Sequence, residues 1–348
     1  MSGKRHVKQS PRQRLGQFCT ENAAELLGGF EPLVSGKTVI DPFAGDCHLV
    51  NWAFAHGALS AITYDIAPKS SGIAPRDSIL SAPIYTDRFL VSNPPYLSRN
   101  KNKDKTAYDI WKQDDLYKCH LASLYPTCKE GILILPSNFI SESRANARRL
   151  FFRYYSIGRM KYFYYQVFPS TTTGIVVFDF YLDMAQPKAF DAEIHYKDRI
   201  VCREILLEEK YNYLFGAAFF DYIADPHPLK VTKFDTTAGS PPNTNIVIGL
   251  LSYGAYALGA HYNSGSPLVC QEKAFTTYQV SIDAVLSEHQ QKQIVERYNE
   301  RLRHYVQLYD GLFLANYMGA EQKIKSRHYS NMLLSRVTKE VLTGVVAS

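Results

Sequence analysis

The sequence of 348 residues is poor in cysteine and has no long hydrophobic run. Its six cysteines are scattered without a C-x-x-C pair, which argues against a disulfide framework and against a zinc site. No apolar stretch approaches the roughly 18 residues of a membrane-spanning helix. Residues 1–14 are polar and basic, without the apolar core of a secretory signal. We therefore expect a reduced, metal-free, cytoplasmic protein that is neither secreted nor bound to a membrane.

Hydrophobic residues make up 46% of the chain, which is enough to close a folded core. The formal net charge of +6 suits a polyanionic partner. The 25 tyrosines and 19 phenylalanines supply core material and would also suit a protein that stacks on nucleic-acid bases. The length exceeds one ordinary domain of about 100–200 residues, so we expect one large domain and a smaller one.

The first half of the chain alternates short apolar runs with helical segments. Four runs read as strands: Thr38–Pro42, Ala61–Ile66, Phe89–Ser92 and Gly131–Leu135. Strands that alternate with helices indicate β-α-β units and a mostly parallel sheet. The aromatic and β-branched runs 161–168 and 174–182 predict a terminal antiparallel pair. The sequence therefore predicts an α/β fold.

The rhythm changes after residue 183. Residues 184–280 lose the alternation and collect Pro, Gly, Thr and Asn, whereas residues 287–318 return to a helical pattern. One face of that pattern carries Ile294, Tyr298, Leu302, Tyr305, Tyr309 and Leu312. We place a domain boundary near residue 185, between domain 1–185 and domain 186–348.

Polar side chains stand where three predicted strands end. Asp41 and Asp65 close the first two, and Asn93 directly follows the third. Ligands of parallel sheets bind beyond the carboxyl ends of the strands. The sequence therefore predicts a binding site at this edge of the sheet.

The third strand runs into Asn93-Pro94-Pro95-Tyr96. The Asn93 side-chain oxygen and the Pro94 carbonyl can accept both hydrogens of an exocyclic amine, whose lone pair is otherwise delocalised into its ring. Two prolines stiffen the backbone, so these acceptors are held in place before the substrate arrives. The Tyr96 ring offers a face on which a base can stack.

This tetrapeptide, in register with Asp41-Pro42-Phe43-Ala44-Gly45 and Gly16-Gln17-Phe18-Cys19-Thr20, resembles the motifs of one methyltransferase family. That family comprises the S-adenosylmethionine-dependent N6-adenine DNA methyltransferases of the γ arrangement, as found in type II restriction–modification systems. The resemblance covers about residues 14–182 and implies a Rossmann-like class I methyltransferase sheet followed by a target-recognition region. It also implies S-adenosylmethionine as the cofactor, with no metal.

The resemblance carries roles to positions of this chain. Catalysis falls to Asn93, Pro94, Pro95 and Tyr96, while Tyr96 and Phe168 (in Val167-Phe168-Pro169) would sandwich the target base. The implied cofactor-binding residues are Gln17, Phe18, Thr20, Asp41, Pro42, Phe43, Ala44, Gly45, Asp65, Ile66, Asp77, Ser78 and Asn93. Asp65 would bind the ribose hydroxyls and Asp77 the adenine ring. The sequence departs from the pattern at Cys47, where many members have a second glycine.

The implied partner is double-stranded DNA, from which the target base must be flipped, and a restriction endonuclease would act on the same site. Candidate phosphate contacts are Arg99, Lys101, Lys103, Lys105, Lys323 and Lys325. Two other substrates share the chemistry of a delocalised amine: an RNA adenine and a protein glutamine amide. A DNA-binding module with a degenerate cofactor site is the non-enzymatic alternative, supported by the departure at Cys47.

Overall fold

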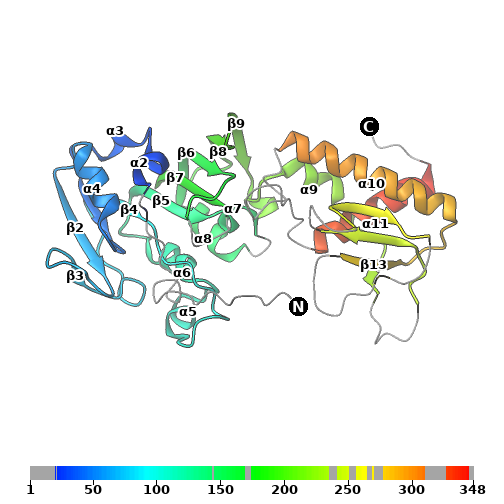
Figure 1. Ribbon diagram of the computed structural model, residues 1–348, viewed down its shortest axis with the longest axis horizontal. Coiled ribbons are helices and arrows are strands. Elements are labelled where there is room, and N and C mark those ends of the chain that lie inside the picture. The colour runs from blue at the N-terminus through cyan, green and yellow to red at the C-terminus, as the bar shows by residue number, and fades with distance from the viewer. Residues whose placement is uncertain are drawn as a thin grey trace, which may run out of the picture. The chain divides into compact units, whose positions relative to one another are not determined.

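The computed structural model describes residues 20, 22–142, 145–168, 174–234, 241–250, 256–264, 269, 277–309 and 327–344. The chain divides into two compact units (Figure 1). The first comprises Met1–Ile140 and Arg144–Tyr213, and the second comprises Ser141–Ser143 and Leu214–Ser348.

A nine-stranded mixed sheet runs through the described part of the first unit. In spatial order its strands are β3 (Ala74–Pro75), β2 (Ser60–Asp65), β1 (Thr38–Asp41), β4 (Phe89–Ser92), β5 (Glu130–Pro136), β7 (Ile175–Leu182), β6 (Tyr155–Phe163), β8 (Lys188–His195) and β9 (Ile200–Leu207). The first five are parallel to one another, whereas β7 is antiparallel to both β5 and β6. The expected α/β fold with a mostly parallel sheet is confirmed, and β6 and β7 form the predicted antiparallel pair. The pair is not terminal as expected, because β8 and β9 follow it in the sheet.

The central strands are apolar because they are covered on both faces. Every residue of β4 is buried, as is all of β5 after Glu130. Gly131 permits their close approach, since a Cβ there would lie 2.5 Å from the Leu90 carbonyl oxygen. The parallel register of β1 with β2 and β4 brings the carboxyl ends of all three strands to one edge of the sheet.

Short helices connect and cover these strands. They are α2 (Ala23–Leu27), α3 (Glu31–Val34), α4 (His48–Ala55), α5 (Thr106–Trp111), α6 (Leu116–Ser123), α7 (Asn138–Ser141) and α8 (Asn146–Tyr154), with a 3₁₀ turn η1 (Glu209–Tyr211) after the last strand. One hydrophobic cluster joins the first helices to the sheet and includes Leu27, Phe30, Val91, Ile134 and Val177. This packing fixes the segment before β1 against the strands that end at the site.

The boundary expected near residue 185 falls inside this sheet. β8 pairs with β6 in parallel, and β9 pairs with β8, so the first unit continues to Tyr213. Strand β8 is half-buried, with alternating residues facing the core, and β9 is the outermost strand. Such a strand has a period of two rather than a continuous apolar run, which is why residues 188–207 resembled irregular chain.

The second unit holds a four-stranded antiparallel sheet in its described segments. Its spatial order is β10 (Val231–Lys233), β13 (Thr277–Ile282), β11 (Ile246–Gly249) and β12 (Gly259–Tyr262), accompanied by α9 (Ala217–Ile223), α10 (Glu288–Leu308) and α11 (Arg327–Thr343). Ser287 and Gln290 form a capping box that begins α10. The predicted buried face of α10 is confirmed for Ile294, Tyr298, Leu302 and Tyr305. Tyr309 is the half-buried C-cap of the helix, and Leu312 lies outside the described residues.

Among the helices in the described segments, none has the length and apolar character needed to cross a membrane.

Candidate active site

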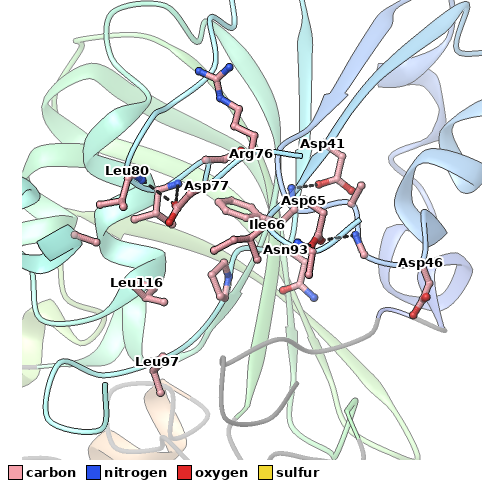
Figure 2. Close-up of a pocket in the computed structure, with 18 of the residues that line it drawn as sticks. Asp41, Asp46, Asp65, Ile66, Arg76, Asp77, Leu80, Asn93, Leu97 and Leu116 are labelled. Carbon is pink, nitrogen blue, oxygen red and sulfur yellow. Dashed lines mark hydrogen bonds between the residues drawn. The ribbon is translucent and has the colours of Figure 1, made fainter. Parts of the chain in front are cut away.

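A cavity of about 290 Å³ lies at the carboxyl ends of β1, β2 and β4. Figure 2 shows Asp65, Ile66 and Asn93 around its centre, with Asp77 and Leu80 on another wall. The predicted site residues that line it are Thr20, Asp41, Phe43, Ala44, Gly45, Asp65, Ile66, Asp77, Ser78, Asn93 and Pro95. Residues separated by up to 75 positions in the sequence thus share one space, because three parallel strands end there.

The Asp65 carboxylate connects the loops that follow β1 and β2. Its Oδ2 accepts a hydrogen bond from the Gly45 N–H at 2.9 Å, and its Oδ1 accepts one from the Ala67 N–H at 2.8 Å. The Ala44 N–H also donates to the Tyr64 carbonyl at 2.8 Å. Asp65 therefore holds the glycine-containing loop beside the cavity, and carboxylate oxygens retain further acceptor capacity for a ligand hydroxyl.

Asp41 is a buried acid at the floor of the cavity, 1% exposed. Burial raises its pKa to about 7, and the nearby negative charge of Asp65 adds to the rise, whereas the hydrogen bond from the Phe43 N–H lowers it. That bond, from Phe43 N to Asp41 Oδ1, measures 3.0 Å. A cationic ligand beside Asp41 would favour its ionised form.

Cys47 explains how the loop manages without a second glycine. It precedes α4 with φ 61° and ψ 20°, which is the left-handed conformation that glycine adopts at little cost. A cysteine there retains the turn but carries the steric strain of its Cβ. Cys47 therefore adopts the backbone conformation that a glycine at this position would favour.

The wall formed by Asp77 and its neighbours is a tight turn. Asp77 Oδ1 accepts hydrogen bonds from the backbone N–H groups of Ile79 and Leu80, both at 3.0 Å. The Trp111 indole N–H donates to the Ile79 carbonyl at 2.8 Å and ties helix α5 to this turn. The apolar side chains of Ile66 and Leu80 border the cavity and remain 56% and 40% exposed. Such open apolar surface suits a planar ligand group.

Part of the cavity wall consists of residues that were not predicted from the sequence to belong to the site. It comes mainly from the segment after the Asn-Pro-Pro-Tyr sequence and includes Leu97, Asn102, Asp104, Ala107 and Leu116. The segment folds back because the Leu97 N–H donates to the Asp115 carboxylate at 3.1 Å. The Tyr108 hydroxyl donates to the Leu97 carbonyl at 2.8 Å. No local motif marks these residues, because each contributes singly through tertiary packing.

The other wall residues missed from the sequence lie in the predicted cofactor loops and the turns beside them. They are Asp46, His48, Leu49, Ala67, Lys69, Arg76, Ile79 and Leu80. Lys69 and Asp46 form an ion pair at 2.5 Å that joins the loops after β1 and β2. These residues lie within a few positions of Gly45, Asp65 or Asp77 in the sequence, and this closeness could have identified them as site residues.

The Asn93 side-chain amide is held at both ends. Its Nδ2 donates to the Thr20 hydroxyl at 3.0 Å, and its Oδ1 accepts from the Tyr96 hydroxyl at 2.5 Å. The Tyr96 hydroxyl also lies 2.8 Å from the Ile134 carbonyl oxygen. The Asn93 amide is thus linked directly to Thr20 and, through the Tyr96 hydroxyl, to β5. Two hydroxyl groups hold it at the cavity.

The predicted stacking residues lie differently from expectation. The Tyr96 ring packs against the hydrophobic cluster and meets the Tyr117 ring edge-on, with centroids 6.0 Å apart. Phe168 is 1% exposed within the same cluster. Neither residue is among those that line the cavity, nor are Pro42 and Pro94. The base-sandwich role of Tyr96 and Phe168 stays a prediction.

Two of the predicted phosphate contacts have structural partners. Arg99 pairs with the Asp109 carboxylate at 2.7 Å, and the Lys105 ammonium donates to the carbonyls of Arg99 and Asn102. Lys101 and Lys103 are exposed. The predicted site residues Gln17, Phe18, Lys323 and Lys325 lie outside the described residues.

Across the described segments, no group of three or more His, Cys, Asp or Glu side chains is arranged to hold a metal ion.

No protein-family model matches the chain, and no curated protein matches it. Solved structures of restriction–modification proteins are similar in part. One of them is a type I restriction–modification methyltransferase subunit from Streptococcus thermophilus, which is 12% identical to this chain with a TM-score of 0.38. The alignment covers 60% of this chain and 58% of the subunit. The type IIG restriction endonuclease BpuSI is 13% identical, with coverages of 65% and 36% and a TM-score of 0.36.

A DrdV–DNA complex is 12% identical, with coverages of 69% and 36% and a TM-score of 0.44. The chain therefore spans about a third to three fifths of the length of these proteins.

Proposed function

We propose that the protein is an S-adenosylmethionine-dependent DNA methyltransferase that methylates the N6 amine of an adenine flipped out of duplex DNA. The observation that carries the proposal is the position of Asn93. Its amide stands in the wall of a cavity whose other residues suit the methyl donor. An acceptor for an amine and a pocket for a donor are the two parts that such a transfer needs.

The cavity fits the donor by its chemistry. The acidic pair Asp41 and Asp65 suits a cationic ligand, and Asp65 can accept hydrogen bonds from ribose hydroxyls. The Asp77 turn and the apolar side chains of Ile66 and Leu80 suit an adenine ring. S-adenosylmethionine supplies an electrophilic methyl group on a positively charged sulfur, so this chain needs no strong base.

The residues of the tetrapeptide orient the amine. Asn93 Oδ1 and the Pro94 carbonyl accept its two hydrogens, which turns the nitrogen lone pair away from conjugation with the ring. Because these acceptors are fixed before the substrate binds, they lose little free energy to reorganisation. The proton that the methylated amine releases passes to water.

We assign target recognition to the second unit, residues 214–348, because the catalytic sheet ends with β9 and the 3₁₀ turn that follows it. Lys101 and Lys103 are our candidates for phosphate contacts, because both are exposed on the segment that follows Tyr96. A restriction endonuclease of the same specificity is the expected functional partner.

Substitution of Asn93 by alanine tests the proposal. We expect Asn93→Ala to lower methyl transfer to DNA at least about a hundredfold, the effect of removing a preorganised hydrogen-bonding group. Donor affinity, measured by calorimetry, should change little. Asn51→Ala, which removes an exposed amide from α4, is the matched control and should retain transfer. Undiminished transfer by Asn93→Ala would contradict the catalytic role.

A further inference from the structure

The Asn93 amide is hydrogen-bonded to the hydroxyl groups of Tyr96 and Thr20, and these bonds serve neither base stacking nor donor binding. We propose that the hydroxyl groups of Tyr96 and Thr20 are positioning groups that fix the Asn93 amide with its oxygen available to the target amine. The inference rests on the proposed function and deepens it. It assigns to Tyr96 a task for its hydroxyl, separate from the stacking expected of its ring.

The two anchors hold opposite ends of a planar group. Tyr96 donates to the oxygen at 2.5 Å, and Thr20 accepts from the nitrogen at 3.0 Å. An amide oxygen has two lone pairs in the amide plane, so a bond from Tyr96 leaves one of them for a second donor. With both ends held, that second lone pair keeps one direction, which is the direction that an incoming amine must meet.

The surroundings of the two hydroxyls make these bonds persistent. Thr20 is 5% exposed, so water does not readily replace it as a partner for the Asn93 nitrogen. The Tyr96 ring is packed against the hydrophobic cluster and against Tyr117, which holds its hydroxyl beside Asn93 and the Ile134 carbonyl. Burial raises the pKa of Tyr96 well above its usual value, so the hydroxyl keeps its proton and remains a donor.

The Tyr96 hydroxyl has one hydrogen, which either the Asn93 oxygen or the Ile134 carbonyl oxygen can accept. Of these, the Asn93 oxygen at 2.5 Å is closer than the Ile134 oxygen at 2.8 Å. When the hydrogen lies toward Asn93, it defines which end of the amide is the oxygen. Without the Tyr96 hydroxyl, Thr20 alone does not fix the orientation, because its hydroxyl can accept from the amide nitrogen or donate to the amide oxygen. The amide can then turn its nitrogen, a donor, toward an amine that needs an acceptor.

Substitutions that keep shape and remove one hydroxyl test the inference. Tyr96→Phe retains the ring, and Thr20→Val retains the volume of the side chain. We expect each to lower the single-turnover rate of methyl transfer about 10- to 100-fold, in the range of losing one well-placed hydrogen bond to a reacting group. Thr20→Ser keeps the hydroxyl and should recover most of the rate lost in Thr20→Val.

Three further readouts separate positioning from other roles. In Tyr96→Phe the donor dissociation constant should stay within about twofold of wild type. The fluorescence of 2-aminopurine at the target position should also be unchanged, since the ring is retained. The double variant Tyr96→Phe/Thr20→Val should lose less than the product of the two single losses, because both act on one amide. Tyr117→Phe removes a hydroxyl from the ring beside Tyr96 and is the matched control, expected within about twofold of wild type.

The possible results distinguish a failure of the positioning role from a failure of the proposed function. A Tyr96→Phe rate within twofold of wild type overturns the positioning role and leaves the proposed function intact. The same holds if its loss of rate is matched by a loss of the 2-aminopurine signal, which would assign the hydroxyl to base capture. Wild-type protein that transfers no methyl group to DNA overturns the proposed function itself.

Discussion

The buried acid Asp41 gives the sharpest quantitative prediction, made for the substitution Asp41→Asn. Asparagine keeps an oxygen that can accept the Phe43 N–H, so the loop contact is retained. What it removes is a charge at a site that is 1% exposed. We expect Asp41→Asn to stabilise the protein at neutral and alkaline pH and to weaken binding of the cationic donor.

The magnitude follows from the pKa. In the folded protein the pKa of Asp41 is raised from 3.8 to about 7, chiefly by burial. The folded state therefore favours the protonated acid, whereas the unfolded chain ionises near pH 4. The free energy of unfolding of the wild type consequently falls as pH rises from about 4 to about 7, and the whole decrease is present above pH 7. At about 1.4 kcal/mol per pKa unit, that decrease is about 4 kcal/mol.

Urea unfolding of wild type and Asp41→Asn at several pH values between 4 and 8 measures this decrease. The difference in unfolding free energy should be near zero at pH 4 and should grow to about 4 kcal/mol in favour of the variant above pH 7. Asp109→Asn is the control, and its difference in unfolding free energy should have the opposite sign. Arg99 holds the pKa of the exposed Asp109 carboxyl below its usual value, so the ionised carboxyl stabilises the folded protein and its removal does not. A difference for Asp41→Asn that stays constant from pH 4 to pH 8 would refute the reasoning.

Two further predictions concern the loops around the cavity. Cys47→Gly should raise the unfolding free energy by about 1 kcal/mol, since a non-glycine residue in the left-handed region costs about that much, whereas Cys47→Ala, which keeps a Cβ, should bring no gain in thermal or urea unfolding. Lys101→Ala/Lys103→Ala should weaken DNA binding and reduce the dependence of log affinity on log salt by about two, as expected for two lost phosphate contacts. The exposed Lys197→Ala in the turn between β8 and β9 is the control, and an equal effect there would contradict a specific role for Lys101 and Lys103.

The sequence was most informative where the chain is buried on both faces. The runs that became β1, β4 and β5 are short, apolar and ended by polar or proline residues, so their strand character and their parallel arrangement followed from pattern alone. Because parallel strands end at one edge, the meeting of Asp41, Asp65 and Asn93 was also predictable.

The sequence was less informative where tertiary contacts decide. The helical pattern of residues 141–153 predicts one helix with Ser141 as its N-cap, whereas Ser141 ends α7 and α8 begins only at Asn146. The cavity wall from the segment 97–116 depends on the half-buried carboxylate of Asp115, which no local pattern reveals. The orientation of Tyr96 depends on a hydrogen bond to a residue three positions away and on the packing around it.

The measurement that tests the central claim most directly is nucleoside analysis after incubation of the wild-type protein with unmethylated duplex DNA and methyl-labelled S-adenosylmethionine. RNA and a protein extract are supplied in parallel reactions. If Asn93 and Pro94 orient an adenine amine beside the donor cavity, the label will be recovered as N6-methyldeoxyadenosine from the DNA. Label recovered only from the RNA or from the protein, or from none of the three, would contradict the account.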